Sequence, residues 1–378
     1  MSTRVFLDNA ATTPIAPEII DMMSEMMKTH FANPSSVHSY GRESKIVVEN
    51  ARKKIASLLN TSPGSIFFTS GGTEADNMAI KCGIHDHKIT HAITSKISHH
   101  AVLYPLQDLE KEGIIKLSYL NINENGVVDL NHLEELLQNN PRTFVSIMHA
   151  NNEIGTIQDI KSIGDICKAH KAIFHSDTVQ TMAHFPFDMQ EINIDFMAAS
   201  AHKFHGPKGV GFVYISNDIK IKPMLRGGGQ ERNMRAGTEN IYGIAALSMA
   251  MEMAYEHLEE ETVYIKGLKK YMMEKLKSEI EDVQFYAKCT DLENSLYTVL
   301  SCHFPETDIA EMLLFNLDIL GVACSGGSAC SSGSSKGSHV LTEIVPDSKR
   351  PGIRFSFSKY NTKEEIDYTI EKLKELFS

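Results

Sequence analysis

Short apolar runs alternate with longer stretches of helical periodicity between residues 64 and 215, and this alternation constrains the fold more than any other feature. Runs of this length predict strands, and the stretches between several of them predict helices. Strand–helix alternation indicates an α/β fold with a mainly parallel sheet that is covered by helices on both faces. Strands are predicted at residues 65–69, 91–94, 114–120, 143–148, 172–176, 196–199 and 210–215, and helices at 73–83, 101–112, 130–138 and 160–169.

The pattern changes after Gly243. Residues 244–281 carry a long helical periodicity that is rich in Met, Leu, Glu and Lys. A chain of 378 residues exceeds the size of one ordinary single-core domain, so two domains that share an interface are expected. The second is predicted as a smaller α+β domain, with strands at 283–287, 295–301 and 353–356 and helices at 308–317 and 362–377.

Composition narrows the class of function. The 37 Lys and Arg residues against 48 Asp and Glu residues give a formal net charge of −11, which argues against a nucleic-acid-binding module. No apolar run reaches the roughly 18 residues of a membrane span, and the N-terminal segment lacks the pattern of a secretory signal, so a cytoplasmic protein is expected. The six cysteines are scattered without a CxxC pair, which predicts neither a disulfide framework nor a metal site.

Residues 324–339 consist mostly of Ser and Gly and include Cys324 and Cys330. Such a stretch cannot bury much apolar surface, so it predicts a mobile loop. A plain linker is the alternative interpretation. Linkers rarely carry a thiol, however, because an exposed thiol is a chemical liability. Cys330 is therefore a candidate functional residue.

The segment SGGTEADN, at residues 70–77, follows a predicted strand and opens a predicted helix. Its two glycines allow the backbone to approach a ligand closely, and the start of the helix offers N–H groups to an anion. Thr73 would add a hydroxyl group. The alternative is a strand–helix turn with a Thr cap, and the motif alone does not decide between the two.

Asp177 and Lys203 follow successive core strands. Lys203 is a candidate Schiff-base lysine for an aldehyde cofactor, and Asp177 is suited to pair with a pyridinium nitrogen and keep it protonated. A capping Asp and a solvated Lys are the alternatives for each residue alone, but their occurrence at successive strand ends favours a cofactor site. His99 or its neighbour His100 is a candidate for ring stacking or acid–base work, with a capping or packed imidazole as the alternative.

Eight motifs extend these observations along nearly the whole chain, from about Leu7 to the last predicted helix. They are LDNAATTP, TSGGTEADN, HANNEIGTIQ, HSDTVQT, SAHKFHGPKGVG, GGGQERNMRAGTEN, SGGSACSSGS and GIRFSFS. In this order they resemble the motifs of group I cysteine desulfurases, which are class-V aminotransferases. The Arg-x-Gly-His-x-Cys pattern of the group II enzymes does not occur in the sequence.

The resemblance implies a pyridoxal-phosphate (PLP) enzyme of fold type I, similar to aspartate aminotransferase, with a mainly parallel seven-stranded sheet. It implies a large domain at residues 15–255 and a small domain at residues 1–14 and 256–378, which carries the mobile loop 324–339. The implied reaction converts L-cysteine to L-alanine and leaves a persulfide on Cys330. The implied partners are a second copy of the chain and a sulfur acceptor, such as an iron–sulfur scaffold or a tRNA-thiolation protein.

Roles for individual residues follow from the resemblance by position. Lys203 matches the Schiff-base lysine, Asp177 the partner of the pyridine nitrogen, and His99 the histidine over the ring. Cys330 matches the catalytic cysteine, and Arg354 the arginine that clamps the substrate carboxylate. The other matches are Gln180 at the phenolic oxygen with Asn152 nearby, Gly72, Thr73, Ser200 and His202 at the phosphate, Thr238 at the phosphate of the neighbouring subunit, and Asn33 at the substrate pocket.

Cys324 departs from the family pattern, which has an ordinary small residue at this position. It is interpreted as a second sulfur acceptor, as a resolving thiol or, with better odds, as a buried bystander. Three other functions remain open. An aminotransferase would have no use for Cys330, a selenocysteine lyase would depend on it less, and a catalytically silent scaffold would not need the cofactor residues.

Overall fold

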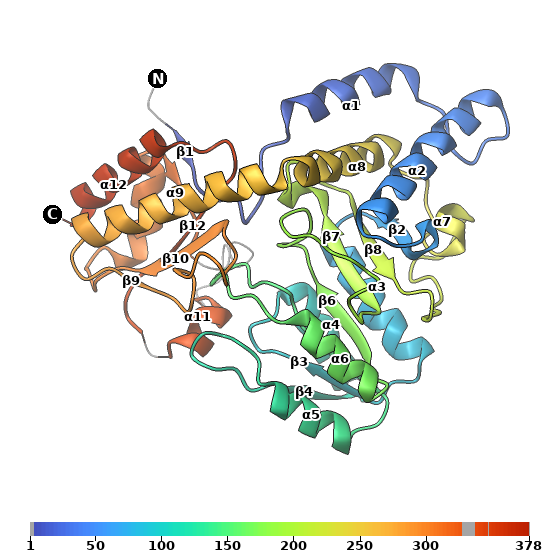
Figure 1. Ribbon diagram of the computed structural model, residues 1–378, viewed down its shortest axis with the longest axis horizontal. Helices are drawn as coiled ribbons and strands as arrows, with labels where there is room; N and C mark the ends of the chain where they lie inside the picture. The colour runs from blue at the N-terminus through green and yellow to red at the C-terminus, as the bar shows by residue number, and fades with distance from the viewer. Residues whose placement is uncertain (1–3, 327–336, 347, 378) are drawn as a thin grey trace.

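A seven-stranded sheet forms the centre of the larger unit of the protein in the computed structural model, which describes residues 4–326, 337–346 and 348–377 (Figure 1). All strands run in one direction except β8, which is antiparallel to both of its neighbours. The predicted α/β class and the mainly parallel sheet are therefore confirmed. The order across the sheet is β2 (Ile66–Thr69), β8 (Gly211–Ile215), β7 (Phe196–Ser200), β6 (Ile173–Asp177), β5 (Thr143–Ser146), β3 (His91–Thr94) and β4 (Lys116–Tyr119).

Helices cover both faces of this sheet because its strands are apolar on both sides. Along β7, Phe196 and Ala198 pack with residues of α3 and α4, whereas Met197 and Ala199 face the opposite layer. This is the burial expected of a doubly covered parallel sheet. The helices of the larger unit are α1 (Pro17–Thr29), α2 (Ser39–Leu58), α3 (Gly72–Asp86), α4 (His100–Lys111), α5 (Leu130–Asn139), α6 (Ile160–Ala169), α7 (Gln230–Asn233) and α8 (Ile241–Glu256), with short 3-10 turns η1 (Pro63–Ser65) and η2 (Ala201–Lys203).

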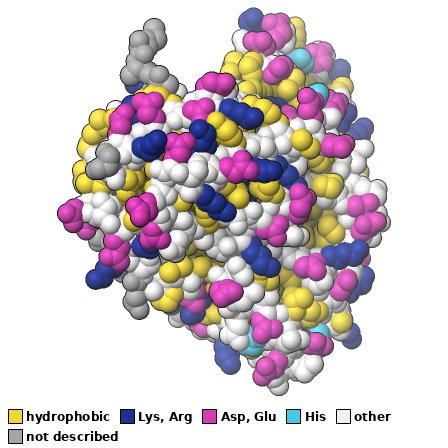
Figure 2. All heavy atoms as spheres, turned by 60° about the vertical axis from the view of Figure 1, so that its left-hand side comes forward, with side chains coloured by type: hydrophobic (Ala, Val, Ile, Leu, Met, Phe, Trp, Pro, Cys, Tyr) yellow, Lys and Arg dark blue, Asp and Glu magenta, His cyan; other side chains and the backbone are white. Residues whose placement is uncertain are grey.

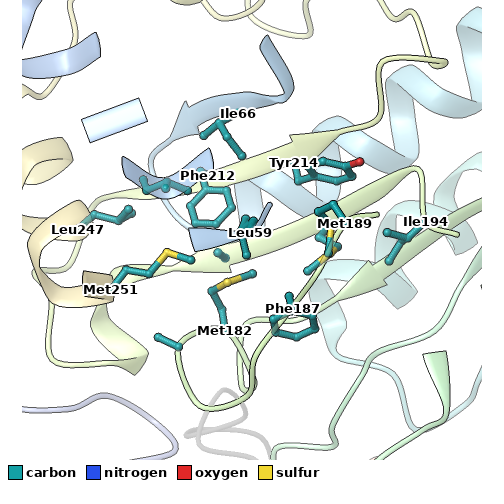
Figure 3. Close-up of a cluster of buried hydrophobic side chains, with 14 of the residues drawn as sticks. Leu59, Ile66, Met182, Phe187, Met189, Ile194, Phe212, Tyr214, Leu247 and Met251 are labelled. Carbon is teal, nitrogen blue, oxygen red and sulfur yellow. The ribbon is translucent and has the colours of Figure 1, made fainter. Parts of the chain in front are cut away.

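The core between the sheet and α8 is shown in Figure 3. Leu247 and Met251 extend from α8 toward Phe212 of β8, and Met182 approaches from the loop after β6. All four side chains are fully buried. Burying a side chain of this size contributes about 1.5–3 kcal/mol relative to leaving it exposed. This core holds the strands that carry the candidate site residues in place.

Charged side chains close the free edge of the sheet at β2. Nη1 of Arg52 and Nη2 of Arg232 each donate to the carbonyl of Ile66 at 2.7 Å, and Glu231 accepts from the backbone N–H of Phe68 at 2.8 Å. Arg52 and Glu231 also form a bidentate pair with two distances of 2.8 Å, and both side chains are almost fully buried. The edge groups that could pair with another strand are thus satisfied within the chain.

The long helical pattern predicted over residues 244–281 is two helices in the structure. α8 ends at Glu256 and α9 (Leu258–Glu279) begins two residues later. His257 between them has φ −110° and ψ 13°, which lies outside helical geometry. Periodicity did not reveal this break because the amphipathic pattern continues through it. The two helices together run from the larger unit into the smaller one (Figure 1).

The smaller unit contains a three-stranded antiparallel sheet and a parallel pair. Val5 and Leu7 from the N-terminus pack with Ile265 and Phe355 in its core. The predicted strand at 295–301 begins later than expected, at Val299. The elements are β1 (Val5–Phe6) paired with β11 (Val322–Ala323), the sheet β12 (Gly352–Ser356), β10 (Val299–His303) and β9 (Gln284–Phe285), the helices α9, α10 (Leu313–Ile319), α11 (His339–Ile344) and α12 (Lys363–Phe377), and the 3-10 turn η3 (Ala310–Met312).

Basic and acidic side chains are interspersed over the outer face of the smaller unit (Figure 2). Glu279, for example, pairs with Lys275 at 3.1 Å and with Lys374 at 2.8 Å. Pairs on such a surface contribute only about 0–1 kcal/mol each. None of the helices in the described part of the chain is long and apolar enough to cross a membrane.

Candidate active site

A cavity of about 370 Å³ lies where the carboxyl ends of the large-sheet strands face the smaller unit. Loops at this edge of a parallel sheet are the usual position of a ligand site in α/β folds. Ten of the residues selected from the sequence line it together. They are Gly72, Thr73, His99, Asn152, Asp177, Gln180, Ser200, His202, Lys203 and Arg354.

Lys203 ends the short turn η2 directly after β7. Its Nζ donates to the carbonyl oxygens of Ala10 and Ala11 at 2.6 and 2.9 Å. His184 supports the turn from behind, since its Nε2 lies 3.2 Å from the carbonyl oxygen of Lys203. The amine is thus held at the cavity wall by two backbone carbonyl oxygens.

Asp177 is the last residue of β6 and is 5% exposed. Its Oδ1 accepts the backbone N–H of Val179 at 3.0 Å, which orients the carboxyl group. Gln180 follows on the same loop, and its Nε2 donates to the carbonyl of Ala10 at 3.0 Å. A buried carboxyl group and an amide are therefore positioned at the strand end that the sequence predicted.

Small residues leave space at the start of α3. Gly71 has φ +150°, a conformation that side chains rarely adopt, so a glycine is required there. A Cβ atom on Gly72 would lie 2.5 Å from Cγ2 of Val179. The cavity wall beside them carries Thr73 and Ser200. Bare backbone at a helix start, together with hydroxyl groups, suits an anion such as a phosphate.

His202 lies beside these hydroxyl groups, and its Nδ1 is 3.1 Å from the Thr12 hydroxyl oxygen. Burial, with smaller effects from Lys203 and Lys208, lowers the pKa of His202 to about 4. The ring is therefore neutral at neutral pH and offers one N–H group.

His99 caps α4, because its Nδ1 accepts the backbone N–H of Ala101 at 3.1 Å. The same ring lines the cavity. The capping and the functional interpretations of His99 are thus compatible. A neutral ring that accepts at Nδ1 carries its proton on Nε2, which is then a hydrogen-bond donor. His100 also lines the cavity, and its ring stacks on Tyr104 at 4.6 Å between centroids.

Arg354 reaches the cavity from β12 of the smaller unit and is 1% exposed. Nη1 donates to the carbonyl of Asn152 at 2.9 Å, and Nη2 pairs with Asp8 at 2.7 Å. Its buried Nε has no hydrogen-bond partner within the described residues. Since a buried donor without a partner is costly, an acidic ligand group in the cavity would be stabilised by this guanidinium.

Three further polar residues of the cavity wall, Asp76, Glu153 and His339, were not selected from the sequence. Glu153 is buried and accepts a short hydrogen bond from the Ser338 hydroxyl, and burial raises its pKa. His339 lies 3.0 Å from the Ser98 carbonyl through its Nε2. Glu153 belongs to the quoted HANNEIGTIQ motif, and the SH pair ends the predicted loop 324–339, but no spacing rule indicates that they meet.

The other selected residues do not line this cavity in the single chain. Asn33 is exposed in the turn between α1 and α2, away from β12 (Figure 1), and its Oδ1 accepts the backbone N–H of Ser35. Thr238 is exposed and borders a smaller hollow with Glu231. Cys330 lies outside the described residues. Burial raises the pKa of the Cys324 thiol, which disfavours the reactive thiolate and favours the interpretation of a packed bystander.

The cavity fits PLP by the chemistry of its side chains. Lys203 offers an amine for the aldehyde, Asp177 a carboxyl group for the ring nitrogen, and the start of α3 an anion site for the phosphate. The close approach of Gly72 to Val179 leaves no room for a larger residue at this end. The donor set therefore agrees with the cofactor that the sequence motifs imply.

Comparisons with known proteins identify the family of the chain. Residues 5–369 match the family model "Aminotransferase class-V". A protein from Dictyoglomus turgidum named cysteine desulfurase IscS is 42% identical over 381 residues, covering 100% of this chain and 95% of its own. A solved NifS-like protein superimposes with a TM-score of 0.91 at 36% identity, covering 99% of both chains. A structure of SspA in complex with cysteine has a TM-score of 0.81 at 30% identity, covering 95% of this chain and 100% of its own.

The chain therefore belongs to the class-V aminotransferase family, and its cofactor is pyridoxal 5′-phosphate. Within that family, several proteins named cysteine desulfurase resemble the chain over nearly its full length.

Proposed function

We propose that the protein is a PLP-dependent cysteine desulfurase that removes sulfur from L-cysteine and holds it as a persulfide on Cys330. The observation that carries this proposal is the cavity in which Lys203, Asp177 and Arg354 lie together. Arg354 also forms a backbone bridge with Ser325, which precedes the segment that contains Cys330. The reaction is balanced without an external oxidant. L-Cysteine and the Cys330 thiol give L-alanine and a Cys330 persulfide, so the substrate carbon is reduced as the sulfur is oxidised.

Bound PLP supplies an electron sink that stabilises negative charge at the substrate α-carbon. Lys203 would hold the cofactor through its amine, and its Nζ would carry the proton away from the substrate α-carbon. Asp177 keeps the ring nitrogen protonated through its buried carboxylate. Arg354 binds the substrate carboxylate with its guanidinium, a planar group suited to this contact.

His99 is proposed as a second proton carrier, acting through its Nε2 at the opposite side of the substrate. Thr73, Ser200 and His202 are proposed to bind the phosphate, with the backbone of Gly72. The remaining cofactor contacts are assigned to Gln180 at the phenolic oxygen, with Asn152 nearby.

Contacts on both sides of residues 327–336 support Cys330 as the sulfur nucleophile. Ser325 forms a bridge with Arg354 through two backbone hydrogen bonds of 2.6 and 3.2 Å. Ser338, at the other side, is bound to Glu153. Cys330 is the fifth residue after Ser325, which gives a tether of at most roughly 18 Å. That length is sufficient for the thiol to enter the cavity and to leave it for an acceptor.

The experiment measures sulfide and alanine release from L-cysteine with a reductant, for the wild type, Cys330→Ala and Cys324→Ala. We expect Cys330→Ala to keep the absorbance of the bound cofactor and lose turnover, because only the nucleophile is removed. Cys324→Ala is the matched control and should remain active, since its thiol is packed. Turnover of cysteine by Cys330→Ala would overturn the assignment.

A homodimer is proposed as the active form. Phe31 and Val37, between α1 and α2, and Tyr40, in the first turn of α2, are 69%, 89% and 57% exposed, and Phe31 and Tyr40 lie 5.7 Å apart between ring centroids. Exposed apolar groups that gather in this way are typical of protein interfaces. In such a dimer Asn33 and Thr238 would reach the partner's cavity. Light scattering tests this, and a monomer at micromolar concentration would contradict it.

The sulfur acceptor is proposed to be another protein, an iron–sulfur scaffold or a different sulfur carrier in the cytoplasm.

We further propose the domain division at residues 15–255 against 1–14 and 256–378. It is supported by the separate cores of the two units, since Val5 and Leu7 pack with Ile265, whereas Ile19 packs in the core beside the large sheet.

A further inference from the structure

A row of buried polar residues lies behind Asp177, on the side of the sheet that α3 covers. Asp177 and His175 alternate along β6 and therefore point to the same face, together with Ser146 of the neighbouring strand β5. Asp76 of α3 faces this row and is 1% exposed. Its Oδ1 lies 3.2 Å from Nε2 of His175, and Nδ1 of His175 lies 2.8 Å from the Ser146 hydroxyl.

This arrangement places two carboxyl groups at one wall of the same cavity, since both Asp76 and Asp177 line it. Two buried carboxylates at one cavity wall repel each other, so ionising both is costly. Asp177 accepts the backbone N–H of Val179 at 3.0 Å, which orients its carboxyl group. Among the described residues no backbone N–H donates to Asp76, and burial and the charge of Asp177 raise its pKa well above the usual range.

His175 does not supply a compensating positive charge. It is fully buried, and burial lowers its pKa to about 3. If its Nδ1 accepts the Ser146 hydroxyl proton, its Nε2 carries the only ring hydrogen and faces Oδ1 of Asp76. The two facing atoms lack a well-aligned hydrogen bond, and a small rotation of the Asp76 carboxyl would supply it.

We propose that Asp76 is a positioning residue, oriented by His175 and Ser146, whose carboxylic proton is donated to Asp177. The two carboxyl groups then share one negative charge, which lies on Asp177 and faces the ring nitrogen of the cofactor. The inference rests on the role of Asp177 proposed above. It adds that the chain supplies a neutral acid behind this carboxylate, which orients Asp177 and prevents a second charge from accumulating beside the cofactor ring.

Infrared spectroscopy of the holoenzyme tests the protonation state directly. A protonated buried carboxylic acid has a carbonyl stretch that is distinct from carboxylate and amide bands. We expect this band in the wild type at neutral pH and its loss in Asp76→Asn. Glu74→Gln is the matched control on the same helix. Glu74 pairs with Arg235 at 2.8 Å, and hydrogen bonds from Arg235 and Ser70 outweigh burial and lower its pKa, so its replacement should leave the band intact.

The dissociation constant of PLP from the same variants separates a positioning role from a purely structural one. Asp76→Asn keeps a neutral donor and should bind within about threefold of the wild type, whereas Asp76→Leu removes a hydrogen bond to a charged group and should weaken binding at least about tenfold. Absence of the acid band, or equal weakening by Asn and Leu, would overturn the proposal.

Failure of Asp76→Asn to fold would also overturn it, because a neutral amide should be tolerated. If only Asp76→Leu fails to fold, the infrared comparison decides alone. Either failure leaves the desulfurase assignment intact, since turnover and the Cys330 persulfide are measured on the wild type.

Discussion

The two walls of the cavity are built differently. The wall from the seven-stranded sheet presents Asp177 and Lys203 at strand ends, above a continuous apolar core. The opposite wall meets the larger unit through polar contacts, chiefly Arg354 with the Asn152 carbonyl and Ser338 with Glu153, and through a small apolar cluster in which Ile154 packs with Tyr286. This difference indicates that the two walls have different roles in the reaction. Proton transfer needs fixed geometry, whereas sulfur transfer needs a nucleophile that approaches the substrate and then leaves.

The largest effect is expected from the sheet wall. Lys203→Ala should lower the turnover of cysteine at least about 10³-fold, because both covalent attachment and proton transfer are lost. Sulfide release and the cofactor absorbance measure this. Lys208→Ala, an exposed lysine nearby, is the control and should change neither. Substantial turnover by Lys203→Ala would mean that another base acts on this wall.

The stability of the sheet wall should depend on its buried ion pair. Glu231→Gln leaves the charge of Arg52 without its bidentate partner, so the free energy of unfolding should fall by about 3–5 kcal/mol. Urea denaturation measures the change. Glu49→Gln removes a more exposed partner of the same arginine and should cost about 1 kcal/mol or less. Equal losses in the two variants would show that burial does not distinguish the pairs.

A smaller effect, confined to substrate binding, is expected at the opposite wall. Arg354→Lys loses the planar guanidinium and should raise the KM for cysteine about 10–100-fold, with the cofactor absorbance unchanged. Arg350→Lys is the control, because Arg350 pairs with Asp282 and does not line the cavity. If kcat fell and KM did not change, Arg354 would act on the chemical step and not on binding.

The smallest of these effects is expected at Ser338, which follows residues 327–336 and contacts Glu153. Ser338→Ala removes the cap of α11, in which its hydroxyl accepts the Leu341 N–H at 3.0 Å, and the contact with Glu153. The free energy of unfolding should fall by about 1–2 kcal/mol. Ser348→Ala, at an exposed position, should be nearly neutral. An unchanged free energy of unfolding in Ser338→Ala would show that the contacts of Ser338 do not contribute to stability.

The sheet wall was also the easier one to predict from sequence. All seven strands and the placement of Lys203 and Asp177 follow from apolar runs and the polar residues that end them. The start of β10 was predicted too early, because residues before Val299 are apolar but form other contacts. Ser295 and the carbonyl of Leu296, for example, accept hydrogen bonds from the buried Lys269.

Residues that act through tertiary pairing could not be found in this way. Asp76 lies within a helix and Glu153 in a loop, and neither has a local pattern that indicates burial beside another acid or hydroxyl. Asn33 and Thr238 were selected by motif alone, and the single chain does not bring them to the cavity. Their proposed roles depend on a second subunit, which periodicity and spacing do not describe.

The most direct test of the account is mass spectrometry of the peptide that contains Cys330, after the wild type is mixed with L-cysteine without a reductant. The account predicts a mass gain of one sulfur atom on this peptide, accompanied by one alanine per modified subunit. Labelling of the Cys324 thiol and not of Cys330, or alanine release without any enzyme-bound sulfur, would contradict the division between the two walls.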